Sequence, residues 1–168
     1  MRKSGRMTPT LFLICPGGPL IFVPENLEGQ TDKDEFANTS RLICIAHAAT
    51  ACVLAMEVWA KFAQPGERLD ETEPPSESFD RREFVTFMGE DRAVQKQIFL
   101  PIIRSGNGRF FGFNDAESPD MNGMTGRFAQ ILSPKAPGAQ MQLLAITMLN
   151  VKGVKTIKLA PQKPRARC

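Results

Sequence analysis

The sequence predicts an α+β fold, in which an antiparallel sheet made of an N-terminal hairpin and a β-meander has two main helices packed on it. Three observations indicate this class. Two apolar runs flank a Pro-Gly-Gly-Pro turn near the N-terminus, two hairpin signals follow one another between residues 83 and 113, and helical periodicity occurs at 33–49 and 137–150. With 168 residues, 42% hydrophobic and 23% charged, the chain has the composition of a globular domain.

The first element is a hairpin with strands at 11–14 and 20–23. This stretch imitates a secretion signal, because it is basic up to Arg6 and mostly apolar afterwards. A signal core has to form a short helix, however, and Pro16 and Pro19 interrupt it. We therefore expect a hairpin at this position, and a cytoplasmic protein whose thiols are reduced.

A helix is expected at 33–49, where Asp32 and Glu35 have the spacing of a capping box. The next segment, 51–62, fits either a continued helix or a central strand, since no Gly or Pro interrupts it. It alternates so that one face is wholly apolar, whereas a single helix of nearly thirty residues would be apolar almost all round. We favour the strand. The whole apolar run from Leu42 to Met56 is shorter than the roughly 20 residues that span a bilayer, so no membrane contact is expected.

The middle of the chain predicts a loop and then a meander. Residues 64–80 contain three prolines and six acids, which indicates an exposed acidic loop. Asn107-Gly108 is a strong hairpin signal, and Gly89 to Arg92 is a second turn. Pro101 indicates that its strand lies at an edge or contains a bulge. We expect three strands, at 83–88, 94–104 and 109–113.

The C-terminal part is predicted to be a helix followed by a basic arm. The helix, at 137–150, presents Met141, Leu144, Ala145 and Met148 as its packing face. Residues 1–160 are expected to form a single domain, and 161–168 a flexible basic tail.

No pattern for a cofactor, a metal or a catalytic residue is found. The four cysteines lack the spacing of a zinc knuckle, and Gly106 to Gly108 joins two strands, whereas a phosphate loop joins a strand to a helix. Cys44 and His47 could meet on one face of a helix, as a nucleophile and its base do, but no third group orients them. We interpret Cys44, His47 and Cys52 as structural residues of the core.

Charge is unevenly distributed along the chain. Residues 121–168 carry eight bases and no acid, and residues 25–120 carry ten bases and all eighteen acids. Such asymmetry is typical of a basic arm that meets nucleic acid or an acidic protein, or of a tail that only solubilises the chain. The arm has no interleaved aromatic residues to stack on bases, which disfavours nucleic acid.

The candidate interaction residues fall into three groups. Trp59 lies on the mixed face of the 51–62 strand, where it is an interface anchor if exposed and a core residue if a helix covers it, in which case Glu57 needs a partner. Two adjacent guanidinium groups could dock a carboxylate or a phosphate, although a solvated strand edge is the simpler interpretation. The complete set is Trp59, Arg81, Arg82, Lys155, Lys158, Lys163, Arg165 and Arg167.

These observations favour a non-catalytic binding or regulatory module that acts through protein–protein contacts. The alternative is a nucleic-acid-associated protein that uses its basic N- and C-terminal segments. A third hypothesis, an enzyme whose chemistry no motif identifies, has less support, because no constellation of titratable groups indicates a reaction. The sequence makes no prediction of oligomeric state.

Overall fold

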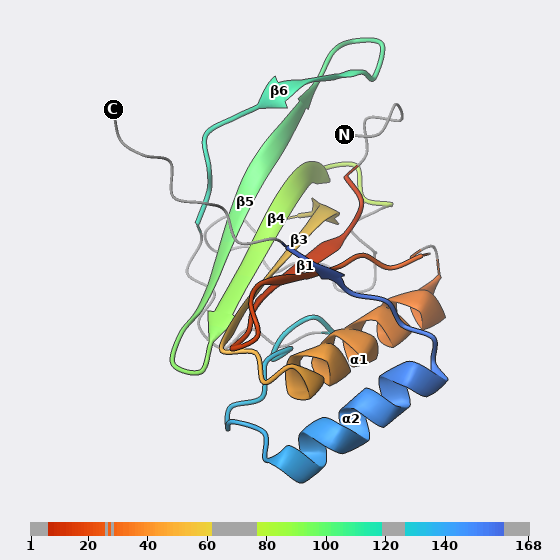
Figure 1. Cartoon of the computed structure of the whole chain (residues 1–168). Coiled ribbons are helices and arrows are strands. Elements are labelled where there is room, and N and C mark those ends of the chain that lie inside the picture. The colour runs from red at the N-terminus through yellow and green to blue at the C-terminus, as the bar shows by residue number, and fades with distance from the viewer. Residues whose placement is uncertain (1–6, 26, 28, 62–76, 119–126, 160–168) are drawn as a thin grey trace, which may run out of the picture.

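The fold is an antiparallel sheet with two helices, as the sequence predicts (Figure 1). The structure is a computed structural model that describes residues 7–25, 27, 29–61, 77–118 and 127–159. Within these ranges the sheet has seven strands in the order β6-β5-β4-β3-β1-β2-β7. The elements in chain order are β1 (Thr10–Ile14), β2 (Leu20–Phe22), α1 (Gln30–Ala46), β3 (Ala51–Ala60), β4 (Arg82–Asp91), β5 (Gln95–Arg104), β6 (Phe110–Phe113), α2 (Ala139–Val151) and β7 (Ile157–Lys158).

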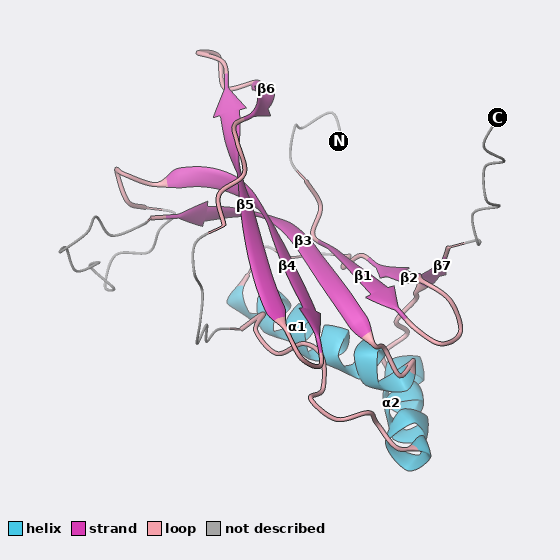
Figure 2. Cartoon of the chain, turned by 90° about the vertical axis from the view of Figure 1, so that its left-hand side faces the viewer, coloured by secondary structure: helices cyan, strands magenta, loops and turns pink. Residues whose placement is uncertain are grey.

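Both helices lie on the same side of the sheet (Figures 1 and 2). α1 covers the strands, and α2 packs against α1. The described residues place no helix on the other side of the sheet, which we call the far face. Because side chains alternate along a strand, each strand contributes one set of residues to the helix side and one set to the far face.

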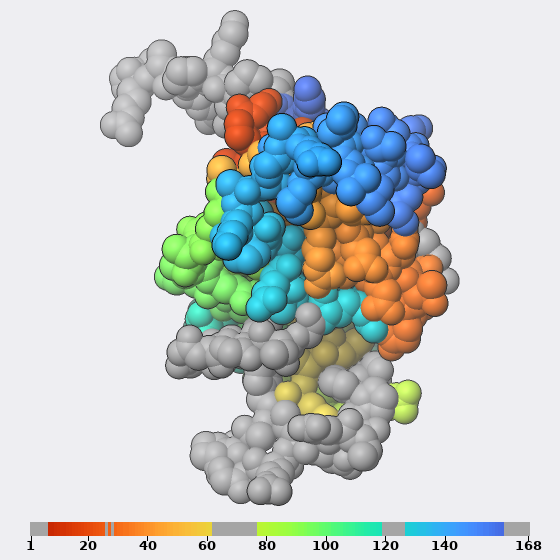
Figure 3. Space-filling model, turned by 90° about the horizontal axis from the view of Figure 1, so that it is seen from below, coloured from red at the N-terminus to blue at the C-terminus, as the bar shows by residue number. Residues whose placement is uncertain are grey.

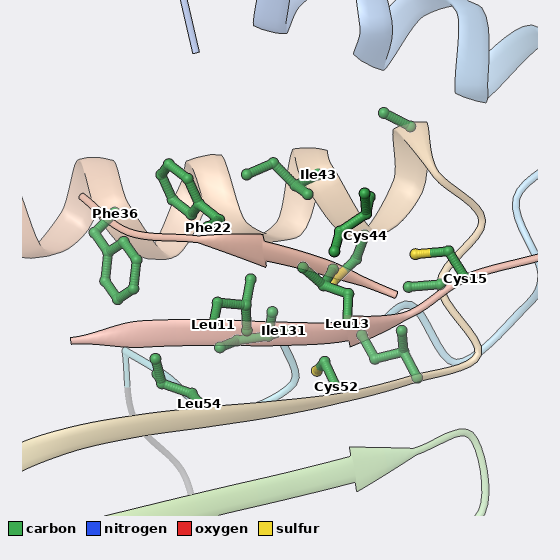
Figure 4. Close-up of a cluster of buried hydrophobic side chains, with 14 of the residues drawn as sticks. Leu11, Leu13, Cys15, Phe22, Phe36, Ile43, Cys44, Cys52, Leu54 and Ile131 are labelled. Atoms are coloured by element: carbon green, nitrogen blue, oxygen red, sulfur yellow. The ribbon is translucent and has the colours of Figure 1, made fainter. Parts of the chain in front are cut away.

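The core lies between α1 and the helix side of the sheet (Figure 4). Leu11 and Leu13 of β1 are almost fully buried, and they are directly opposite Leu54 and Cys52 of β3. α1 closes this layer with Ile43 and other apolar residues. Burying one such large side chain stabilises the fold by about 1.5–3 kcal/mol. The alternation in 51–62 therefore marks a strand, and the continued helix is excluded.

The two predicted hairpins are present. β1 and β2 pair across the Pro16 to Pro19 turn, where Gly18 has a positive φ of 103° that favours glycine. β5 and β6 pair across Asn107-Gly108, where Gly108 has a φ of 77°. The predicted turn at 89–92 is wrong, because β4 continues to Asp91. The Asp91 carboxylate accepts hydrogen bonds from the backbone N–H groups of Ala93 and Val94, at 2.7 and 2.8 Å, and this moves the turn toward Val94.

The position of Pro101 differs from both alternatives that the sequence suggests. β5 is an interior strand between β4 and β6, and its irregularity lies at Ile103 and Arg104. The Pro101 carbonyl accepts the Asn114 N–H at 3.0 Å, on the side of β5 that faces β6. The Pro101 nitrogen, which carries no hydrogen, faces this side as well. Asn114 lies just beyond the end of β6, and no ladder bond of β6 is lost there.

Both helices lie within three residues of their predicted bounds, but their details differ. α1 begins after Gly29, whose N–H donates to the Asp32 carboxylate at 3.2 Å, so Asp32 stands inside the first turn and not before it. In α2, Ala145 and Leu149 are the buried residues. Met141, Leu144 and Met148, which were expected to pack, are exposed. β7, which the sequence did not predict, pairs with β2 through Ile157 and Lys158.

Candidate interaction surfaces

The structure brings Trp59 and Arg81 together. Trp59 projects from the far face of β3 and is 43% exposed, so the interpretation as a core residue is wrong. The Arg81 guanidinium carbon lies 4.8 Å from the centroid of the Trp59 ring, within range of a cation–π interaction. Trp59 and Arg81 therefore form one surface feature, at the end of β3 and the start of β4.

Arg82 is directed elsewhere. It pairs with Glu117, and its guanidinium lies over the Phe84 ring at 4.9 Å. Both partners of the ion pair are exposed, so the pair itself contributes little to stability. Arg81 and Arg82 do not form the double guanidinium fork that their adjacency suggested, because neighbouring residues at a strand point to opposite faces.

A network of charges lies on the far face beside Trp59. Arg104 of β5 donates from Nε and Nη2 to the two oxygens of the Glu83 carboxylate. The same Nη2 donates to Glu57 Oε1 at 3.1 Å, and the Met7 backbone N–H donates to Glu57 Oε2 at 2.8 Å. The side chains of Glu57, Glu83 and Arg104 are only 15%, 9% and 25% exposed. The sequence predicted a partner for Glu57 only if a helix covered this face. Glu57 has one although Trp59 is exposed, because its own side chain is largely buried.

Burial and hydrogen bonding change the pKa values of two groups in this network. Removal of the Glu57 carboxyl from water raises its pKa, and a hydrogen bond with the Glu83 carboxyl raises it further. Hydrogen bonding to Glu83 raises the pKa of Arg104, which stays protonated. Two carboxylates thus share one guanidinium. The sequence did not predict Glu83 or Arg104, because only the register of β3, β4 and β5 brings them to Glu57.

The surface of α2 is apolar on nearly every side. Its thirteen residues include no charge, and only a narrow stripe, Ala145 and Leu149, is buried. Figure 3 shows α2 (blue) beside α1 (orange) on the side of the molecule that faces away from the sheet. The exposed large apolar side chains of α2 are Met141, Leu143, Leu144, Ile146, Met148 and Val151.

Lys155 and Lys158 follow α2 directly, and both are exposed. Lys155 lines a cleft of about 390 Å³, whose apolar lining includes Phe22 and Phe36. Charged residues line the cleft as well, and two of them form an ion pair, in which Lys152 Nζ lies 2.5 Å from Glu35 Oε1. Lys158 lies in β7, opposite Leu20. The other arm residues of the candidate set, Lys163, Arg165 and Arg167, lie outside the described residues, as does the acidic loop between 64 and 76.

Three cysteines are buried and free, as expected for core residues. Burial raises the pKa of the Cys15 thiol to about 11. A hydrogen bond to Cys44 raises the pKa of Cys52, which also donates to Glu90 Oε1 at 3.5 Å. Such thiols are poor nucleophiles. His47 stands at the C-terminal cap of α1, where burial and the nearby Lys158 lower its pKa.

Among the described helices, none combines the length and the apolar character that crossing a membrane requires. Comparison of the chain with models of known families, with curated proteins and with solved structures gave no match.

Proposed function

We propose that the chain is a non-catalytic binding module that acts through protein contacts, and that α2 is its docking element. One observation carries this proposal. Met141, Leu144, Met148 and Val151 follow one another at intervals of three, four and three residues, and all four are exposed. We call this stripe the α2 seam.

The α2 seam has the spacing at which one helix packs against another. A helix on the surface of a globular protein normally has one apolar stripe, which faces the core. α2 already uses Ala145 and Leu149 against α1, and the seam is a second stripe, displaced around the helix by roughly 100° at 3.6 residues per turn. Exposed apolar stripes of this kind mark contact sites. An amphipathic helix of a partner protein fits the seam.

The charges around the α2 seam favour an acidic partner. Residues 127–159 contain five bases and no acid. Arg127 is neutralised by Asp34, and Lys152 by Glu35. Lys135 and Lys155 flank the two ends of α2 and are exposed. A second copy of α2 would fit poorly, because antiparallel pairing would place lysines opposite lysines.

Site-specific photo-cross-linking in the cells that naturally make the protein tests the proposal. The photoreactive residue is placed at 144 in the seam, or at 143 as the control, because Leu143 and Leu144 are 65% and 61% exposed but point in different directions. We expect a discrete protein adduct from position 144 only. Mass spectrometry then identifies the adduct, and the cross-linked segment is made as a peptide for titration.

Leu144→Glu should weaken binding of that peptide at least tenfold, which corresponds to about 1.4 kcal/mol, because a charge would enter the apolar contact. Leu143→Glu should leave the affinity within about twofold of the wild type. Equal cross-linking at both positions, or equal loss with both variants, would contradict the assignment of α2 as a specific docking element.

A further inference from the structure

The β5–β6 hairpin projects beyond the rest of the sheet (Figures 1 and 2). β4 pairs with β5 only as far as Pro101, so among the described strands the part of β5 after Pro101 pairs with β6 alone. A ribbon of two strands is only marginally stable in water, and further strands or a packed helix normally support it. β6 is also the edge of the sheet, and no described helix lies against it. The hairpin therefore ends in an edge that lacks a neighbour within the described chain.

The edge that β6 presents is open to pairing. Natural edge strands carry charged residues, proline or a bulge, which discourage pairing with another chain. β6 consists of Phe110, Phe111, Gly112 and Phe113, and Phe111 and Phe113 are 76% and 46% exposed. The register shift between β5 and β6 lies before Gly112, so a regular edge remains from Gly112 to Asn114.

The backbone of Phe113 faces this open edge. The N–H of its neighbour Asn114 donates to the Pro101 carbonyl at 3.0 Å, on the side of β5. Because the N–H and C=O groups of successive residues point to opposite edges of a strand, those of Phe113 point away from β5. An antiparallel strand placed opposite Phe113 would exchange two backbone hydrogen bonds with it.

We propose that a second copy of this chain adds to this edge, with β6 antiparallel to β6 about a two-fold axis at Phe113, so that the two sheets become one. The charges that flank β6 favour this occupant. Arg109 precedes the strand and Asp115 follows it, both are exposed, and neither has an ion-pair partner among the described residues. In antiparallel self-pairing, the basic start of each strand lies along the acidic end of the other. A parallel arrangement would place like charges together, which is unfavourable.

The other charges near β6 are already paired. Arg104 is turned away from the edge, toward Glu83 of β4 and Glu57 of β3, which lie two and three strands from β6. Glu117, at the acidic end, forms its ion pair with Arg82. The charges that remain for a contact are therefore one base at the start of β6 and one acid at its end. The α2 seam lacks this self-complementarity, because its flanking charges are all basic.

The geometry of the edge also suits a second copy. The two-fold axis places Phe113 opposite itself, and aromatic side chains that face each other across paired strands attract one another. Because the hairpin projects from the sheet, two copies can meet there while their helices stay apart (Figure 2). An edge-to-edge contact is smaller than the standard interface of about 800 Å² per partner, so we expect a reversible dimer.

An exchange of charges tests the proposal. Arg109→Asp places acid beside acid at both contacts, and Asp115→Arg places base beside base, so each variant alone should dimerise at least about tenfold more weakly than the wild type. An equimolar mixture of the two variants restores a base beside an acid at both contacts and should dimerise again. Both side chains are exposed, so neither reversal should unfold the chain, which circular dichroism verifies. Lys135→Asp, which reverses an exposed base outside β6, is the matched control.

Sedimentation velocity over a concentration series measures the outcome. The wild type and Lys135→Asp should pass from monomer to dimer as the concentration rises. Each reversal alone should move this transition to higher concentration, and the mixture should move it back. A wild type that stays monomeric at every concentration would overturn the proposal. So would a dimer that survives both reversals, a mixture that fails to restore it, or a dimer that Leu144→Glu in the α2 seam disrupts.

Discussion

Glu57 and Glu83 share Arg104, yet their replacement by Gln should have very different effects on stability. Glu83 accepts two hydrogen bonds from the guanidinium, and its side chain is 9% exposed. A hydrogen bond to a charged group contributes about 1.5–3 kcal/mol. Gln retains one acceptor oxygen and turns an NH2 group toward the guanidinium, so Glu83→Gln loses one of these bonds and the charge of the pair. We expect the free energy of unfolding to fall by about 2–3 kcal/mol.

Glu57→Gln should cost much less. Its carboxylate accepts one hydrogen bond from Arg104 and one from the Met7 N–H, and a Gln oxygen can keep one of them. The substitution also removes a second buried negative charge, whose desolvation is unfavourable. These effects oppose each other, and we expect the free energy of unfolding at neutral pH to change by at most about 0.5–1 kcal/mol. The two variants should therefore differ by about 2 kcal/mol.

Urea and thermal unfolding, followed by circular dichroism, measure this difference. For a chain of this length, 2 kcal/mol corresponds to about 4–8 °C in Tm. The pH dependence of the free energy of unfolding provides a second test. Because the pKa of Glu57 is raised on folding, the folded chain binds this proton at a higher pH than the unfolded chain. The wild type should gain stability relative to Glu57→Gln as the pH falls through the folded pKa toward the unfolded value of about 4.5, and the gain should end there.

Equal destabilisation by the two substitutions would refute this reasoning, because it would mean that both carboxylates act as equivalent partners of Arg104. A gap between wild type and Glu57→Gln that does not change with pH would refute the raised pKa.

Two further predictions concern α2 and the end of α1. Leu149→Ala should destabilise the fold by about 2–4 kcal/mol, because it leaves a cavity against α1, while Leu143→Ala on the exposed side should stay within about 0.5 kcal/mol in the same urea titration; equal effects would mean that α2 is packed in another orientation. Because the pKa of His47 is lowered on folding, the unfolded chain takes up this proton first, so the wild type should lose stability relative to His47→Gln as the pH falls below about 6.5. If the difference in the free energy of unfolding between the wild type and His47→Gln is the same above and below pH 6.5, the buried environment of His47 is contradicted.

The elements that the sequence predicts well are those with local signals. The Pro-Gly-Gly-Pro and Asn107-Gly108 turns require positive φ at one glycine each, and both are present. The alternation in 51–62 was enough to favour a strand, because a helix would have had no polar side. The sequence predicted the turn after β4 too early, because Gly89 suggested it there. Its actual position is determined by the Asp91 carboxylate, which accepts hydrogen bonds from the Ala93 and Val94 N–H groups.

The features that the sequence misses depend on contacts between distant segments. Arg104 lies 21 residues from Glu83 and 47 from Glu57, and only the pairing of β3 with β4 and of β4 with β5 brings the three side chains together. The orientation of α2 has the same origin. Its apolar residues occur on almost every side, so periodicity did not determine which stripe faces α1. The sequence grouped Met141, Leu144 and Met148 into one stripe but assigned that stripe to the core, whereas all three are exposed.

The α2 seam is more than folding of the chain requires. Folding of this chain needs one apolar stripe on α2 and one apolar face on the sheet, and both are used in the core. A second apolar stripe on α2 adds nothing to that core and lowers solubility in the free chain. The two sides of the molecule differ in charge, since lysines flank the seam, whereas the far face carries both signs, with Arg81 and Arg104 beside Glu57 and Glu83. The seam and the far face lie on opposite sides of the sheet (Figure 2). A substitution in the seam therefore leaves the far face unaffected, and the proposed docking role of α2 can be tested separately.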